Sequence, residues 1–78
     1  MQKGKVRFYR ERRKAWAAQT EIGRVWLPVD SVRVVEGGGL RTLRPAEPRP
    51  RPQRDDEVVF LIEQQGQEPQ ASEWALVV

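Results

Sequence analysis

The chain has 78 residues, 38% of them hydrophobic and 32% charged, which allows one domain with a small core and rules out two. It contains no Cys, His or Asn, which excludes disulfides, thiolate or imidazole metal ligands, and catalysis by Cys or His. All 14 Lys and Arg lie in residues 1–54, where five acids leave +9, whereas residues 55–78 carry six acids and no base. Such a positive block attracts polyanions, so nucleic acid is the first partner class to consider.

Hydropathy argues against a membrane protein. The longest apolar runs are the five residues 58–62 and the five residues 74–78, far short of the roughly 20 that span a bilayer. The segment behind Met1 is basic and polar, unlike a secretory signal. We therefore expect a cytoplasmic protein without membrane contact.

The first two segments differ in how clearly they predict a strand. Residues 5–10 alternate bases with apolar or aromatic side chains, the period of a strand with one polar face. Residues 11–19 are rich in good helix formers, so propensity favours a helix. That helix would be short, with Trp16 as its only large apolar side chain, so we expect a second strand and keep the helix as the alternative.

The middle of the chain is rich in β-branched residues. In residues 24–29, alternation places Val25 and Leu27 on one face and Trp26 on the other, away from the main apolar stripe. Residues 32–35 continue the β-branched pattern, and three glycines at 37–39 predict a flexible loop before residues 40–43.

The last third combines a proline-rich segment with two strands. Residues 44–54 contain four prolines and many arginines, so we expect residues 44–56 to form a flexible, extended insert. Residues 57–63 predict a central strand that is apolar on both faces, and residues 74–78 predict the last strand. Phe60, Trp74 and Leu76 are expected in the core. Five short strands in one small domain indicate an all-β barrel, which closes its own sheet edges.

Four stretches occur in a characteristic order: Lys3-Gly-Lys-Val-Arg-Phe-Tyr9, then Val25-Trp-Leu-Pro28 with Asp30-Ser-Val32, then Gly39-Leu-Arg-Thr-Leu43, then Val58-Val-Phe60 followed by Gly66 and Pro69-Gln-Ala71. This order resembles the cold-shock domain and covers nearly the whole chain. The resemblance implies a five-stranded antiparallel OB-type barrel with the proline- and arginine-rich insert before strand four. It also implies binding of single-stranded RNA or DNA with low sequence specificity.

The motifs of that family are degenerate here. Its first RNA-binding motif, Lys-Gly-Phe-Gly-Phe, is matched by Lys14-Ala-Trp-Ala-Ala18, which keeps one of two aromatics, and the preceding turn needs one extra residue. In the second motif Pro28 replaces a His, and Leu40 replaces a loop aromatic. Losing two or three stacking positions costs on the order of 2 to 6 kcal/mol. We therefore expect weakened affinity.

The resemblance also assigns a nucleic-acid site. Four basic residues would contact phosphates, namely Lys5, Arg7, Arg13 and Lys14. Four aromatic residues would stack on nucleobases, namely Phe8, Tyr9, Trp16 and Trp26. The alternative role for these aromatics is core packing. Phe8 has the same strand parity as Val6, so burying one and exposing the other requires a bulge or bend.

Other functions find less support. Ser31 and Ser72 have no His partner that could activate a nucleophile. Asp55-Asp56-Glu57 is one local acidic run beside the arginine-rich insert, rather than a metal or acid–base site. The glycines at 37–39 lack the Lys and Ser or Thr of a phosphate-binding loop. We expect no enzyme, no cofactor, no metal and no small-molecule substrate. The alternative to nucleic-acid binding is a protein-interaction module on the same barrel, using the proline-rich arm or the aromatic face.

Overall fold

The computed structural model of the protein describes residues 1–64 and 68–77. In these residues the chain forms one short 3₁₀ helix, η1 (Val29–Ser31), and seven strands: β1 (Gln2–Arg10), β2 (Ala15–Thr20), β3 (Gly23–Pro28), β4 (Val32–Glu36), β5 (Gly39–Thr42), β6 (Glu57–Gln64) and β7 (Gln70–Leu76). None of the helical structure described is long and apolar enough to cross a membrane. Gly66, one of the residues that carried the cold-shock resemblance, lies outside the described residues.

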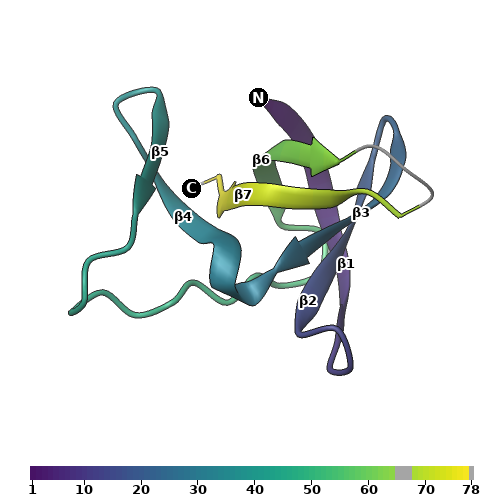
Figure 1. Ribbon diagram of the computed structural model, residues 1–78, viewed down its shortest axis with the longest axis horizontal. Helices are drawn as coiled ribbons and strands as arrows, with labels where there is room; N and C mark the ends of the chain where they lie inside the picture. The colour runs from purple at the N-terminus through teal and green to yellow at the C-terminus, as the bar shows by residue number, and fades with distance from the viewer. Residues whose placement is uncertain (65–67, 78) are drawn as a thin grey trace.

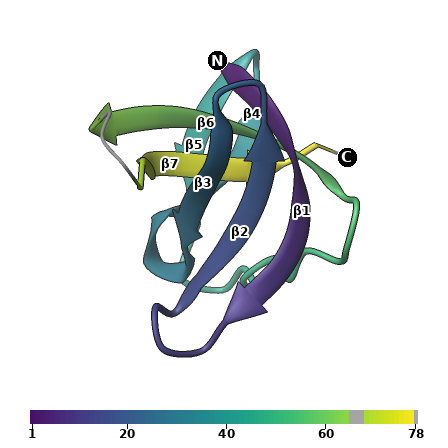
Figure 2. The same cartoon turned by 90° about the vertical axis from the view of Figure 1, so that its right-hand side faces the viewer.

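Five of the strands close into a barrel (Figures 1 and 2). The sheet order is β3-β2-β1-β6-β7, and β3 returns to β7 through one parallel pair, Trp26 with Gln70. The other barrel pairings are antiparallel. The predicted all-β fold, a small OB-type barrel with the insert before its fourth strand β6, is therefore confirmed.

Strands β4 and β5 form a hairpin outside the barrel, and the five-strand prediction did not include it. β4 pairs with β7 through Val32 and Arg33, and β5 pairs with β4 alone. Figure 1 shows the hairpin standing apart from the barrel strands. Its turn is tight, rather than the predicted flexible loop: Gly37 and Gly38 have φ values of 60° and 81° between the paired residues Glu36 and Gly39. Positive φ at both central residues is what a two-residue hairpin turn of type I′ requires.

The main core fills the barrel with side chains from every barrel strand. Its fully buried members include Val6, Leu27, Phe60 and Trp74, each with 0% exposure. The indole Nε1 of Trp74 donates a hydrogen bond of 2.6 Å to the carbonyl oxygen of Pro28, which gives the buried polar atom a partner. The predicted core positions of Phe60 and Trp74 are confirmed, and Leu76 packs against this core half-buried.

The alternative of a helix over residues 11–19 is wrong, and the second strand is confirmed for Ala15–Thr20. Residues 11–14 form a turn, and Ala15–Thr20 is a strand that pairs with β1 on one side and β3 on the other. Three of its alanines, Ala15, Ala17 and Ala18, are at most 3% exposed. Tertiary pairing on both edges therefore outweighs the helix propensity of these residues.

The proline- and arginine-rich insert returns the chain from β5 to β6 along one end of the barrel (Figure 1). Residues 44–56 contain no strand or helix, as expected from their prolines. Pro52 is nevertheless buried, and backbone hydrogen bonds join the end of the insert to β1, from Asp55 N to Val6 O (2.7 Å) and from Val6 N to Asp56 O (2.9 Å). The insert is therefore held against the barrel at its last residues.

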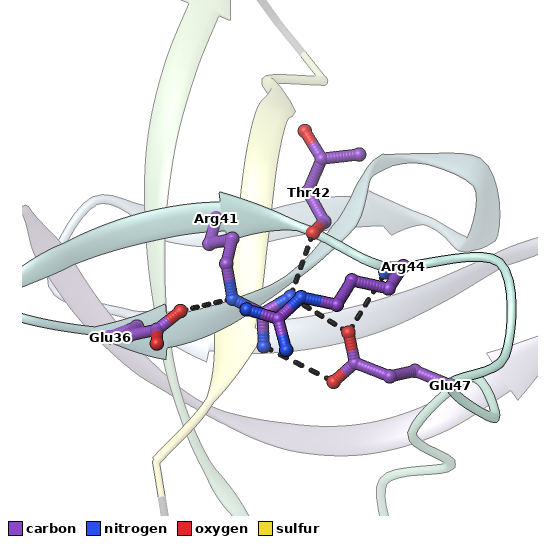
Figure 3. A network of polar contacts seen from close by, with 5 residues as sticks. All are labelled: Glu36, Arg41, Thr42, Arg44 and Glu47. Atoms are coloured by element: carbon purple, nitrogen blue, oxygen red, sulfur yellow. Dashed lines mark hydrogen bonds and ion pairs between the residues drawn. The ribbon is translucent and has the colours of Figure 1, made fainter.

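A polar network connects the start of the insert to the hairpin (Figure 3). The Arg41 guanidinium donates to both carboxylate oxygens of Glu47, at 2.7 and 3.1 Å, and also pairs with Glu36. The backbone N–H of Arg44 donates to the same Glu47 carboxylate at 2.8 Å. A bidentate Arg–carboxylate pair has a defined orientation, so the network fixes where the insert leaves β5.

This network predicts an unusual titration. The hydrogen bond from Arg41, followed by that from the Arg44 backbone, lowers the pKa of Glu47 from 4.5 to about 2. Because the pKa is depressed in the folded state, the stabilising contribution is present above the unfolded value and is lost as the pH falls from 4.5 to about 2. We expect an NMR titration of the side-chain carboxyls to give Glu47 a midpoint near 2.

The substitution Arg41→Gln should return the Glu47 midpoint toward its usual range. Arg33→Gln is the matched control, because Arg33 lies on the same hairpin but pairs with Glu73. A Glu47 midpoint near 4.5 in the unsubstituted protein would contradict the network.

Candidate nucleic-acid interface

One row of side chains crosses the outer face of β1, β2 and β3. Phe8 pairs with Ala17, and Ala17 pairs with Trp26, so the three residues lie side by side on neighbouring strands. Their side chains form a second, small cluster opposite the main core. The register of β1 shifts between Val6 and Phe8, which leaves Arg7 without a partner on β2. The irregularity predicted for these residues is therefore confirmed, with Val6 in the core and Phe8 half-buried on the outer face.

Trp26 lies on the outer face but is not open to solvent. Its side chain is on the opposite side from Val25 and Leu27, as alternation predicted, yet the residue is only 2% exposed. The ring of Phe8 meets the indole edge-on, with centroids 6.1 Å apart and planes at 83°. Trp26 is therefore covered rather than exposed, and its predicted stacking on bases stays a prediction.

Three arginines cover the aromatic pair. The guanidinium carbon of Arg13 lies 4.4 Å from the indole centroid, and that of Arg10 lies 5.4 Å from both rings. Arg24 lies 5.2 Å from the Phe8 ring and 5.9 Å from the indole. These distances are within the range of cation–π attraction. We call the set Phe8, Ala17, Trp26, Arg10, Arg13 and Arg24 the arginine-capped face.

Arg10 and Arg24 were missing from the predicted site. Strand alternation carried the signal, because Arg10 follows Phe8 by two residues and Arg24 precedes Trp26 by two. Each therefore shares a face with its aromatic neighbour. Neither forms an ion pair with the acids whose side chains the structure describes.

Tyr9 and Trp16 lie on the other face of the same strands. They are paired across β1 and β2, with ring centroids 4.8 Å apart and planes tilted by 57°. Trp16 is half-buried and packs against the main core. Of the four aromatics predicted to stack on bases, Phe8 and Trp26 therefore share one face, and Tyr9 and Trp16 share the other.

Strand alternation explains this division. The outward positions of β2 are Ala15 and Ala17, which cluster with Trp26, so Trp16 between them is on the opposite face. A shift of one residue in a strand moves every side chain to the opposite face. The sequence match of Lys14-Ala-Trp-Ala-Ala18 to the first RNA-binding motif therefore does not bring Trp16 to the face of Phe8 and Trp26.

The four predicted phosphate contacts also separate. Arg13 is on the arginine-capped face and pairs with Glu68, whereas Arg7 pairs with Asp55 of the insert at 2.8 Å. Lys5 is an exposed residue of β1, and Lys14 is exposed in the turn with φ of 48°. Of these four, Arg13 is the one whose guanidinium lies over the aromatic pair.

The charge around this face is strongly positive. Residues 1–28, which contain β1, β2 and β3, have eight basic and two acidic residues, a net charge of +6. Within the described parts of the chain, no group of three or more acids gathers in a way that could hold a metal ion. The arrangement offers exposed guanidinium planes and cations, which are suited to stacking and to phosphate contacts.

No protein-family model matches the chain, and no curated protein matches it significantly. The cold-shock resemblance therefore remains a prediction from the sequence, while the barrel is established by the fold.

Proposed function

We propose that the protein binds single-stranded nucleic acid through the arginine-capped face, with low sequence specificity. The observation that carries this proposal is the set of three guanidinium groups lying over Phe8 and Trp26 on one face of a basic barrel. Bases stack on guanidinium planes as well as on aromatic rings. Cations also neutralise phosphates whatever the sequence.

Burial of Trp26 changes the expected mode of binding. Direct stacking on the indole requires Arg10, Arg13 and Arg24 to move, whereas stacking on the outer side of these guanidiniums does not. All three arginines are exposed residues, so their outer sides are open to a ligand. We therefore propose that bases rest on the guanidinium planes, with the indole beneath them, and that neighbouring phosphates contact the same arginines.

The competing function is a protein contact through the proline-rich arm. Pro52 is buried and Pro50 is half-buried, so this stretch lies against its own barrel. A partner that binds a polyproline helix would have to detach the arm first. This packing favours the nucleic-acid proposal.

The dependence of affinity on salt tests the proposal. Labelled oligo-dT and oligo-U are titrated with the protein at about 50 mM and about 200 mM salt, and binding is followed by fluorescence anisotropy. Three or four phosphate contacts predict a log–log slope of about −2 to −3. No binding at the lower salt, or binding with a slope near zero, would refute the proposal.

A further inference from the structure

A second aromatic and basic cluster lies on the opposite side of β1 and β2 from the arginine-capped face, next to the insert. A cleft of about 310 Å³ is lined by the Tyr9–Trp16 pair, by Arg49, Pro50 and Arg51 of the insert, and by Glu11 of the turn. Its volume is at the lower end of the range for ligand sites. We call it the Tyr9–Trp16 cleft.

We propose that the bound single strand continues over the edge of β1 into the Tyr9–Trp16 cleft, where Arg49 and Arg51 hold a phosphate and the two aromatics hold a base. This inference rests on the proposed function. It gives the proline- and arginine-rich insert a role as part of the binding site.

In the described part of the chain, the second half of β1 has an unpaired edge, and this edge lies between the arginine-capped face and the Tyr9–Trp16 cleft. β6 pairs with β1 over Gln2–Lys5 only, whereas β2 pairs with it as far as Arg10. The end of the insert bonds to the backbone of Val6, just before this edge. Phe8 and Tyr9 are consecutive residues whose side chains are on opposite faces, so the thickness of one strand separates the two subsites.

The chemistry of the cleft fits one nucleotide. Tyr9 is 38% exposed, so part of its ring is available to a base. Arg51 forms no ion pair with any acid whose side chain is described, and the Arg49–Asp30 pair joins side chains that are 61% and 83% exposed. Such an exposed pair is weak, so a phosphate can replace Asp30. The Glu11 carboxylate is an acceptor for an N–H on the edge of the base.

The geometry also imposes a length requirement. A short strand can cover the arginine-capped face alone, whereas only a longer strand can also enter the cleft. OB-type domains occupy about 4 to 16 nucleotides, so oligo-dT of about 4 and about 9 nucleotides separates the two cases. The difference in affinity between these probes measures the contribution of the cleft.

The test compares two double variants of the insert. In Arg49→Ala/Arg51→Ala, both cleft cations are removed. In the control, Arg44→Ala/Arg54→Ala, the same charge is removed from the same segment at residues that do not line the cleft. We expect the cleft variant to bind the longer oligo-dT about tenfold or more weakly, because a hydrogen bond to a charged group contributes about 1.5 to 3 kcal/mol.

For the longer probe the salt slope should also become shallower by about 0.7 in the cleft variant, corresponding to the one phosphate that is no longer neutralised. Binding of the shorter probe should change no more than in the control. Equal weakening in the two variants, or equal weakening for the two probe lengths, overturns the role of the cleft.

A third variant separates this inference from the proposed function. Arg10→Ala/Arg24→Ala removes cations from the arginine-capped face and should weaken both probes. If it does so while the cleft variant behaves like its control, the cleft is refuted and the proposed function stands. If neither probe binds the unsubstituted protein, both proposals fail.

Discussion

Trp74→Ala is expected to destabilise the protein by about 3 to 5 kcal/mol, the usual cost of truncating a buried aromatic residue to alanine. Trp74 is fully buried in the main core with Val6, Leu27 and Phe60. Its removal leaves a cavity and also leaves the carbonyl oxygen of Pro28 without the indole donor. Domains of this size have a free energy of unfolding of roughly 4 to 12 kcal/mol. The substitution therefore removes much of the total, measured by urea unfolding followed by circular dichroism.

Leu61→Ala is the matched control for this prediction. Leu61 is on β6 and pairs with Glu73, the neighbour of Trp74, but it is 39% exposed. Its truncation should cost about 1 kcal/mol or less, because half-exposed side chains lose little on removal. Trp74→Phe keeps an aromatic ring and removes the donor, which should cost about 1 to 3 kcal/mol. A loss below about 1 kcal/mol for Trp74→Ala would contradict the assignment of this residue to the core.

Arg10→Ala/Arg24→Ala is expected to weaken the binding of oligo-dT by about 100-fold at low salt. Each arginine offers a charge-assisted contact worth about 1.5 to 3 kcal/mol, and two such contacts sum to about 3 kcal/mol or more. Arg13 is left in place because its guanidinium also pairs with Glu68. The dissociation constant is measured by anisotropy, and thermal unfolding checks that the variant is folded.

This variant also distinguishes two modes of stacking. Removing Arg10 and Arg24 uncovers part of the Phe8 and Trp26 rings. If bases stacked directly on the indole, the variant would bind as well as the unsubstituted protein or more tightly. The loss should also exceed that of Arg44→Ala/Arg54→Ala, which removes the same charge elsewhere.

The Trp74 prediction concerns the stability of the fold, whereas the Arg10/Arg24 prediction concerns binding at its surface. Truncation of Trp74 acts on the barrel itself, whereas Arg10 and Arg24 are exposed residues on its surface. We therefore expect the arginine variant to keep the unfolding temperature close to that of the unsubstituted protein. A large drop in that temperature would assign these arginines a structural role in covering Phe8 and Trp26.

The local sequence pattern was sufficient to predict most strands of the barrel. Apolar runs in β6 and β7 and the alternation in β1 and β3 predicted the strands that surround the core, because period-2 burial is a local property. Proline content likewise predicted the irregular insert. β2 was uncertain because its alanines favour a helix, and only pairing with β1 and β3 decides the strand.

By itself, the sequence determined the fold class, the buried Phe60 and Trp74, the irregularity near Phe8 and the basic end of the chain. Tertiary structure alone decided which side chains meet. The register of β1 with β2 places Trp16 against Tyr9, and the capping of Trp26 depends on arginines from the turn and from two strands. The physical reason is that strand alternation gives a side chain's face, whereas its neighbours on that face depend on register and turn length.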